Sequence, residues 1–106
     1  MTNSQVVQYL LDKLPTRQRV TARAMFGGHG LYADGRFFAV VYRGRAYFKT
    51  DQRSRGAYVD RGLPHFRPYP GKHLTAYYEV PRDVLDDREE LVRWARAAIR
   101  AAKARR

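Results

Sequence analysis

The fold is decided by residues 37–42, F-F-A-V-V-Y, because their aromatic and β-branched side chains favour an extended strand. Two turn signals bound this stretch, D-G at 34–35 and R-G at 43–44. Tight hairpin turns need positive φ angles, which glycine and aspartate tolerate. A returning strand, A-Y-F-K, follows at 46–49. Strands separated by so few residues must pair with their neighbours, so the sequence predicts an antiparallel meander.

The meander extends in both directions from this centre. Upstream, strands are expected at 21–26 and 31–33, with G-G-H-G between them at 27–30. Downstream, another strand is expected at 76–80. Three prolines in the intervening stretch place residues 66–69 on a loop or an irregular edge strand, because proline cannot donate to a sheet ladder.

The segment before the sheet predicts an amphipathic helix. Asn3 or Ser4 can cap its start, and Pro15 ends it because proline lacks the backbone N–H. Its apolar residues recur at i, i+3, i+4 and i+7, namely Val7, Leu10, Leu11 and Leu14. A short middle helix is expected over 51–62, capped by its aspartate and ended by its last glycine in the left-handed conformation.

The final segment predicts the longest helix. Asp86 or Asp87 caps it, with Glu89 or Glu90 three residues later, as in a capping box. A 3.6-residue period gives its buried stripe, which comprises Leu91, Trp94, Ala95, Ala98, Ile99 and Ala102. Its basic residues fall on the opposite, solvent-facing side, namely Arg93, Arg96, Arg100 and Lys103. We expect Trp94 to be largely buried, and the whole chain, 1–106, to form one α+β domain.

The charge of the chain is its most unusual global property. Its 106 residues contain 21 lysines and arginines against 10 aspartates and glutamates, a net charge of +11. Such an excess favours polyanionic partners, including nucleic acid. Only four of the 21 are lysine, however, and arginine together with alanine and glycine is typical of a GC-rich genome. The charge therefore favours nucleic-acid binding without establishing it.

The inventory of reactive side chains predicts no catalytic residue, no cofactor and no metal site. Cysteine is absent, which excludes disulfides, thiol nucleophiles and zinc–thiolate sites. Ser4 and Ser54 lack the G-x-S-x-G context of an activated serine. The histidines His29, His65 and His73 do not stand at the i, i+4 spacing of a helical ligand pair. The clustered carboxylates at 86–90 are explained by helix capping.

Neither a signal peptide nor a membrane helix is visible in the sequence. The N-terminus is polar, and no stretch approaches the ~18 apolar residues that a membrane helix needs. We therefore expect a cytoplasmic protein that has no contact with a membrane.

The glycine cluster at 27–30 has two interpretations. A phosphate-binding loop would need a following helix and a Lys-Ser/Thr pair, whereas here a strand follows and that pair is absent. Glycines also let a strand bulge or turn tightly, and we favour this role. At least one of these glycines should then have a positive φ or lie at a bulge.

Basic and aromatic residues alternate along the centre of the predicted sheet. The stretch contains Arg36, Phe37, Phe38, Tyr42, Arg43, Arg45, Tyr47, Phe48 and Lys49. Proteins that bind single-stranded nucleic acid combine such groups, because rings stack on bases and cations follow the phosphates. The favoured alternative is that alternate rings fill the core while Arg43 and Arg45 stand at a hairpin tip.

A longer motif surrounds the glycine cluster, R-x-M-F-G-G-x-G-L-Y. Its residues here are Arg23, Met25, Phe26, Gly27, Gly28, Gly30, Leu31 and Tyr32. The motif resembles the signature of the TfoX (Sxy) N-terminal domain family. The resemblance continues through the stretches at 34–35, 38–39, 46–51, 77–81 and 91–95. It implies a two-layer α+β domain, a meandering antiparallel sheet with N- and C-terminal helices and a short middle helix packed on one face.

The resemblance also implies a function. The family regulates natural competence together with the cyclic-AMP receptor protein at promoters of DNA-uptake genes, and it supplies no catalytic residues. The longer regulators carry a second domain, for which this chain is expected to have no room after Arg106.

Two hypotheses follow, with monomer and homodimer both open. The first is a non-enzymatic regulatory adaptor that contacts a protein in transcription regulation. The second is a small basic protein that binds nucleic acid directly. In both, the expected contact residues are Arg93, Arg96, Arg100, Lys103, Arg43 and Arg45.

Overall fold

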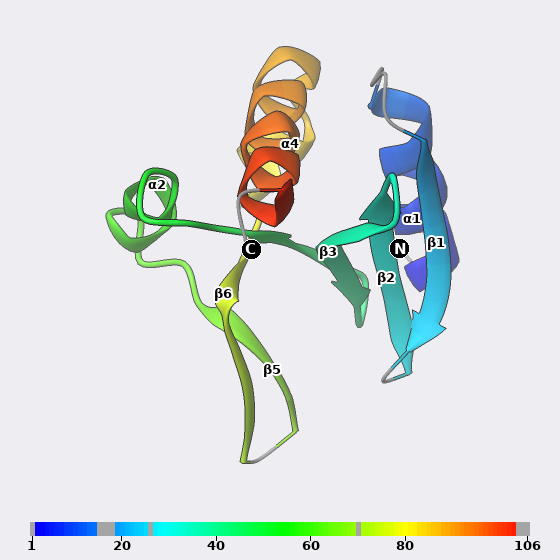
Figure 1. Cartoon of the computed structure of the whole chain (residues 1–106), viewed down its shortest axis with the longest axis horizontal. Coiled ribbons are helices and arrows are strands. Elements are labelled where there is room, and N and C mark those ends of the chain that lie inside the picture. The colour runs from blue at the N-terminus through cyan, green and yellow to red at the C-terminus, as the bar shows by residue number, and fades with distance from the viewer. Residues whose placement is uncertain (1, 15–18, 26, 70, 104–106) are drawn as a thin grey trace.

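The computed structural model describes residues 2–14, 19–25, 27–69 and 71–103, which form one antiparallel sheet and helices (Figure 1). The strands are β1 (Val20–Met25), β2 (Gly28–Ala33), β3 (Arg36–Tyr42), β4 (Arg45–Lys49), β5 (His65–Tyr69) and β6 (Lys72–Glu79). The helices are α1 (Asn3–Lys13), α2 (Arg55–Val59), α3 (Arg82–Leu85) and α4 (Arg88–Lys103). The strand order is β1-β2-β3-β4-β6-β5, so the predicted α+β class and meander are confirmed.

The helices lie on one face of the sheet and enclose the main core there. Helix α4 contacts β3 and β4, helix α1 contacts β2, β3 and α4, and Tyr58 of α2 joins the same buried cluster. The large side chains of that cluster that are completely buried are Leu10, Leu31, Phe38, Phe48 and Leu91. Figure 1 shows the β5–β6 hairpin extending away from these helices.

A second, smaller cluster covers the opposite face of the sheet. Val40, Phe66 and Tyr77 are buried there, and their partly buried neighbours are Phe37, Tyr42, Tyr47, Leu74 and Ala76. Strand β3 therefore contributes to both clusters. The pairing of β2 with β3 shifts between Leu31 and Tyr32, which face Ala39 and Phe37. This bulge leaves Phe38 as an extra residue, so that Phe38 and Ala39 both join the helix-side core.

The hairpin turns have the backbone geometry that their sequences require. Asp34 and Gly35 have φ angles of 50° and 82°, and Arg43 and Gly44 have φ angles of 51° and 75°. Two successive positive φ angles are typical of the tight turns whose twist matches that of the strands. Both predicted hairpins are thus confirmed.

Helix α1 starts one residue earlier than the cap prediction allowed. Thr2, not Asn3 or Ser4, is the N-cap, and it forms a capping box with Gln5. The Asn3 side chain instead donates to the Gly27 carbonyl at 3.2 Å and accepts from the Gly44 amide at 2.8 Å. Sequence reasoning missed this role because the two partners are distant in the chain. Pro15 lies outside the described residues.

Two other segments differ from their predictions in extent. The middle helix is confined to Arg55–Val59, because the Asp51 carboxylate caps a preceding turn through the Arg53 and Ser54 amides. Gly62 does follow it with a positive φ of 69°. Strand β6 begins several residues before position 76. Strand β5 is an irregular edge strand with two register shifts, which confirms one of the two alternatives predicted for residues 66–69. Helix α3 was not predicted.

Helix α4 begins as its sequence predicts. The Asp87 carboxylate accepts a hydrogen bond from the Glu90 amide at 3.2 Å, which identifies Asp87 as the cap. The apolar stripe is buried except at one position, with Leu91, Ala95, Ala98, Ile99 and Ala102 enclosed. The expectation of a largely buried Trp94 is confirmed, although the side chain keeps a partly exposed edge while it packs against the main core. It lies at the edge of the stripe, where it packs on Tyr58 of α2 rather than under the sheet.

The glycine cluster serves the backbone, as predicted, in two different ways. Gly27 turns the chain between β1 and β2 with a φ of 79°. A Cβ atom on Gly28 would lie 2.2 Å from the Val41 carbonyl oxygen. A Cβ atom on Gly30 would lie 2.6 Å from the Met25 side chain and 2.8 Å from the Phe37 ring. The close packing of β2 against β1 and β3 therefore requires glycine at positions 28 and 30.

We predict that Gly28→Ala lowers the free energy of unfolding by about 1–3 kcal/mol, because its methyl group collides with backbone that cannot move alone. Gly56→Ala is the matched control, since nothing lies within 4 Å of its virtual Cβ and it sits in helix α2. The control should be neutral or stabilise the protein by up to about 1 kcal/mol. Urea unfolding followed by circular dichroism measures both. Equal midpoints for the two variants would contradict the packing described for Gly28.

Trp94 and Phe48 offer a second comparison of stability. Phe48→Ala removes a completely buried ring and should cost about 3–5 kcal/mol. Trp94→Ala removes a ring that is already partly in water, so we expect only about 1–3 kcal/mol. Circular dichroism is again the readout, because Trp94 is the only tryptophan in the chain. A larger loss for Trp94→Ala than for Phe48→Ala would show that Trp94 belongs to the core after all.

Candidate functional site

The expected contact residues fall on two separate surfaces. Arg93, Arg96, Arg100 and Lys103 are all exposed on α4, as the helical period predicts. Arg43 and Arg45 belong to the β3–β4 hairpin, where Arg45 pairs at 2.8 Å with Glu79 of β6. Tyr47, which lies on β4 between β3 and β6, faces the second cluster on the helix-free side. The fold therefore does not bring the two groups of arginines together.

The helix-free face of the sheet carries the aromatic and basic residues noted in the sequence. Phe38 and Phe48 point to the main core, whereas Phe37, Tyr42 and Tyr47 belong to the second cluster. The favoured interpretation is thus confirmed for Phe38 and Phe48, which fill the core, and for Arg43 and Arg45, which stand at the hairpin tip. The other three rings fill the second cluster instead. Rings in the second cluster contact one another, with centroid separations of 5.3 Å for Tyr32–Phe37, 5.0 Å for Phe37–Tyr77, 5.3 Å for Tyr42–Phe66 and 4.8 Å for Tyr47–Phe66.

Cations cover several of these rings. Arg23 lies 5.2 Å from the Tyr32 centroid, Arg43 lies 5.4 Å from that of Tyr42, and Lys49 lies 5.5 Å from that of Tyr77. These are ordinary cation–π separations. Burial raises the pKa of the Tyr77 hydroxyl, so that ring stays neutral at physiological pH. Because the rings contact one another in tilted or edge-on geometry and several lie against cations, this face resembles a small second core more than a platform for bases.

A cleft lies between α2 and α4, on the helix side of the molecule. Its volume is about 250 Å³. The residues that line it come from the end of β4, the turn before α2, α2 itself and α4, and they are Lys49, Asp51, Arg53, Ser54, Ala57, Tyr58, Arg93, Trp94, Ala97 and Arg100. Apolar side chains thus form one part of the lining, and basic side chains form the rest together with Asp51 and Ser54. Helix α4 supplies both kinds because Trp94 and Ala97 stand between its buried stripe and its basic face.

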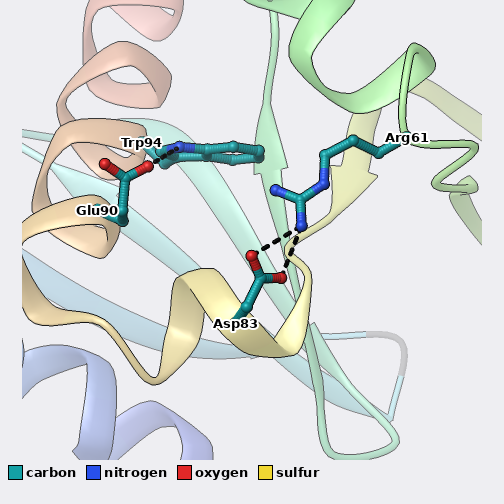
Figure 2. A network of polar contacts seen from close by, with 4 residues as sticks. All are labelled: Arg61, Asp83, Glu90 and Trp94. Carbon is teal, nitrogen blue, oxygen red and sulfur yellow. Dashed lines mark hydrogen bonds and ion pairs between the residues drawn. The ribbon is translucent and has the colours of Figure 1, made fainter.

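Trp94 is held in place by contacts on several sides (Figure 2). Its indole N–H donates to the Glu90 carboxylate at 3.2 Å, and its ring meets Tyr58 edge-on with centroids 4.8 Å apart. The Arg61 guanidinium lies 5.7 Å from the indole centroid. Arg61 in turn donates to both carboxylate oxygens of Asp83 on α3, at 2.7 and 2.8 Å. The indole therefore forms a fixed wall of the cleft.

The ionisable groups around Trp94 follow from these contacts. The hydrogen bond from Arg61 holds the pKa of the Asp83 carboxyl below its usual value. Burial raises the pKa of the Tyr58 hydroxyl, which keeps that ring neutral. Desolvation acts to raise the pKa of Asp51, but hydrogen bonds from Ser54 and Arg53 prevail and lower it. Both carboxylates are thus charged at neutral pH and already engaged with donors.

The basic side of the cleft consists of arginines. Arg53 and Arg100 are exposed, and Arg93 leaves 70% of its side chain in water while pairing with Glu90. Lys49 also lines the cleft, with its ammonium group 5.5 Å from the centroid of the Tyr77 ring. Arg93 and Arg100 also line a shallow hollow over α4, whose other lining residues are Arg88, Glu89, Val92 and Arg96. The cleft and the outer surface of α4 are therefore continuous.

Ser54 and the histidine and carboxylate side chains are the described groups that bear on catalysis and metal binding. Ser54 Oγ lies 3.2 Å from Asp51 Oδ1 and accepts from the Asp51 amide, an arrangement that stabilises the turn before α2. No group of three or more histidine, aspartate or glutamate side chains among the described residues could hold a metal ion. The side chain of His73 lies outside that description. Also within the described residues, no helix is long and apolar enough to cross a membrane.

Sequence reasoning missed the cleft, because it depends on α2 meeting α4 in space. One signal was present, since Trp94 falls at the edge of the α4 stripe, about 60° from its centre on a helical wheel. A large aromatic residue at such an edge borders both the core and solvent. The position of Tyr58 opposite it could not be read from the spacing of residues.

The motif that surrounds the glycine cluster occupies β1, the turn and β2. Arg23 and Met25 lie on β1, and Leu31 and Tyr32 lie on β2. Phe26 lies outside the described residues. These residues shape the β1–β2 hairpin and its fit against β3, through Gly28, Gly30 and the Arg23–Tyr32 contact.

Comparison with known proteins agrees with this architecture. A search of curated proteins finds no match to the chain. The family model described as the TfoX N-terminal domain matches residues 11–102, which is nearly the whole sequence. That range includes the glycine motif, every strand named above and almost all of α4. The chain therefore belongs to the TfoX N-terminal domain family.

Proposed function

We propose that this chain is a regulatory adaptor that acts without catalysis, by binding a protein partner through the basic outer surface of α4. Membership of the TfoX N-terminal domain family supports a domain like that of the competence regulators. The observation that carries the proposal is the exposure of the arginine face of α4 beside its well-buried apolar stripe. A face that the fold does not need for its own stability is free to serve a partner.

The partner that the family resemblance suggests first is a transcription regulator such as the cyclic-AMP receptor protein. Contact with such a regulator requires a location in the cytoplasm, which is part of the proposal. Arginine, tryptophan and tyrosine dominate the energetic centres of protein interfaces. All three meet at the edge of the α4 surface, where Arg93, Trp94 and Tyr58 line the same cleft.

Direct binding to nucleic acid is the second candidate, and the net charge of +11 favours it. The same exposed face of α4 would then contact phosphates. The two candidates differ in their dependence on salt. Each phosphate contact releases counterions, so that log K falls against log salt with a slope of about −0.9 per contact. A protein interface of mixed charge and apolar character has a weaker dependence.

The triple variant Arg96→Gln, Arg100→Gln, Lys103→Gln tests the surface itself. We predict a nearly unchanged melting temperature, because all three side chains are exposed. Binding to the regulator should weaken, whereas any binding to DNA should weaken equally for all sequences, with a salt slope reduced by up to about 2.7. Arg36→Gln, Arg43→Gln, Arg45→Gln is the matched control, because it removes the same charge from exposed residues of β3 and β4 and the turn between them, outside α4.

Calorimetric titration of the purified chain with the purified cyclic-AMP receptor protein of the same organism separates the candidates. Titration with promoter DNA alone, at several salt concentrations, is the companion experiment. The proposal expects saturable binding to the regulator that the triple variant weakens and the control variant does not. Tight binding to DNA alone with a steep salt slope, and no heat with the regulator, would instead support the nucleic-acid candidate.

A further inference from the structure

We propose that the α2–α4 cleft is an anchoring pocket for one aromatic or branched aliphatic side chain, carried on an acidic peptide segment of the partner. The inference rests on the proposed function, and it adds the chemistry of the partner segment to it. Three properties of the cleft carry the argument, namely its size, its fixed apolar wall and the sign of its charge.

The size of the cleft matches a single side chain. Its volume of about 250 Å³ lies below the ~300–1,000 Å³ that is common for sites of whole small molecules. Its apolar lining comes from Ala57 and Tyr58 on α2 and from Trp94 and Ala97 on α4. The two rings touch edge-on, so a flat or branched apolar group would rest against the small side chains of Ala57 and Ala97 and the exposed edge of the indole.

The apolar wall is fixed before any partner arrives. Trp94 is held by Glu90 at its indole N–H, by the edge-on ring of Tyr58 and by Arg61, which Asp83 orients in turn (Figure 2). A ring that is already ordered loses little conformational entropy when a partner binds. Such fixed aromatic residues at the centre of a contact are the usual energetic anchors of an interface.

The charge around the cleft selects an acidic segment. Arg53 stands on the α2 side, and Arg93 and Arg100 stand on the α4 side. The one carboxylate in the lining, Asp51, already accepts hydrogen bonds from the Arg53 and Ser54 amides and from the Ser54 hydroxyl. Carboxylates on both sides of the inserted side chain would therefore meet guanidinium groups, which bind them in two-pronged geometry.

A peptide suits these features better than a nucleic-acid strand. Proteins that bind single-stranded nucleic acid use a row of aromatic rings along a groove that is positively charged throughout. In this cleft the Trp94 indole is the one ring besides Tyr58, and the Arg61 guanidinium already lies over it. The carboxylates of Asp51 and Glu90 interrupt the positive charge around the cleft. An inserted side chain needs only one pocket, and its neighbouring carboxylates reach the arginines on either side.

Two short peptides and one polyanion test the inference. The first peptide has one phenylalanine flanked on each side by two glutamates, and the second has serine in its place with the same charge. A heparin fragment serves as the polyanion. Emission from Trp94 is the readout, since this is the only tryptophan in the chain and phenylalanine does not emit when indole is excited. We expect the phenylalanine peptide to change the Trp94 emission and to bind at least about tenfold more tightly than the serine peptide.

Ala97→Glu and Arg96→Gln form a matched pair of variants. Each lowers the net charge by one, but Ala97 lines the cleft and Arg96 lies on the outer surface of α4. Ala97→Glu should lower the affinity for the phenylalanine peptide about tenfold or more, because the new side chain fills the pocket and adds a negative charge to it. Arg96→Gln should change the affinity for the same peptide by less than about threefold. Binding of heparin should fall equally in both. If Ala97→Glu does not fold, Ala57→Glu on exposed Ala57 replaces it.

The possible results divide cleanly. Equal binding of the two peptides, or unchanged binding of the phenylalanine peptide to Ala97→Glu, overturns the anchoring pocket. Heparin binding that Ala97→Glu weakens far more than Arg96→Gln also overturns it, since the cleft would then take a polyanion. If the peptide behaves as expected but the receptor protein does not bind the chain, the pocket stands and the proposed partner is wrong. If the receptor binds the parent and Ala97→Glu equally, the regulator role stands and the pocket does not serve it.

Discussion

Strand β3 is buried on both of its faces, and each layer of the molecule depends on that burial. Phe38, Ala39 and Val41 join the helices, whereas Val40 joins the opposite cluster. A strand that alternated strictly could not place Phe38 and Ala39 together on one side. The bulge opposite Leu31 and Tyr32 makes this possible. Close approach of β2 to β3 in turn requires the bare backbone of Gly28 beside Val41.

The outer elements attach to this centre and set the position of the candidate site. Asn3 ties the start of α1 to both flanking hairpins, through Gly27 and Gly44. Helix α4 lies across β3 and β4 with its alanine-rich stripe inward, so its arginines must point outward. Helix α2 follows β4 directly and meets the edge of that stripe at Trp94. The cleft thus arises where two helices approach each other above the sheet, outside the buried core.

Local patterns in the sequence were sufficient for much of the fold. The run at 37–42 and the two hairpin turns determined the meander, because strand propensity and positive φ angles are properties of neighbouring residues. The same is true of the Asp87 cap and of the arginine face of α4. Predictions failed where a side chain had a distant partner. Asn3 is not the cap, because it reaches Gly27 and Gly44. The contact between Trp94 and Tyr58 was missed because α2 and α4 are far apart in the chain. The two groups of arginines separate because the sheet stands between them, which composition cannot show.

The account makes one central claim, that β3 and its two clusters maintain the fold while the outward surface of α4 and α2 binds the partner. Hydrogen–deuterium exchange of the chain, alone and with the purified cyclic-AMP receptor protein, tests that claim most directly. We expect slower exchange on binding in residues 55–59 and 88–103, with β3 equally protected in both states. Slower exchange confined to the β3–β4 hairpin and the helix-free face, with α4 unchanged, would contradict it.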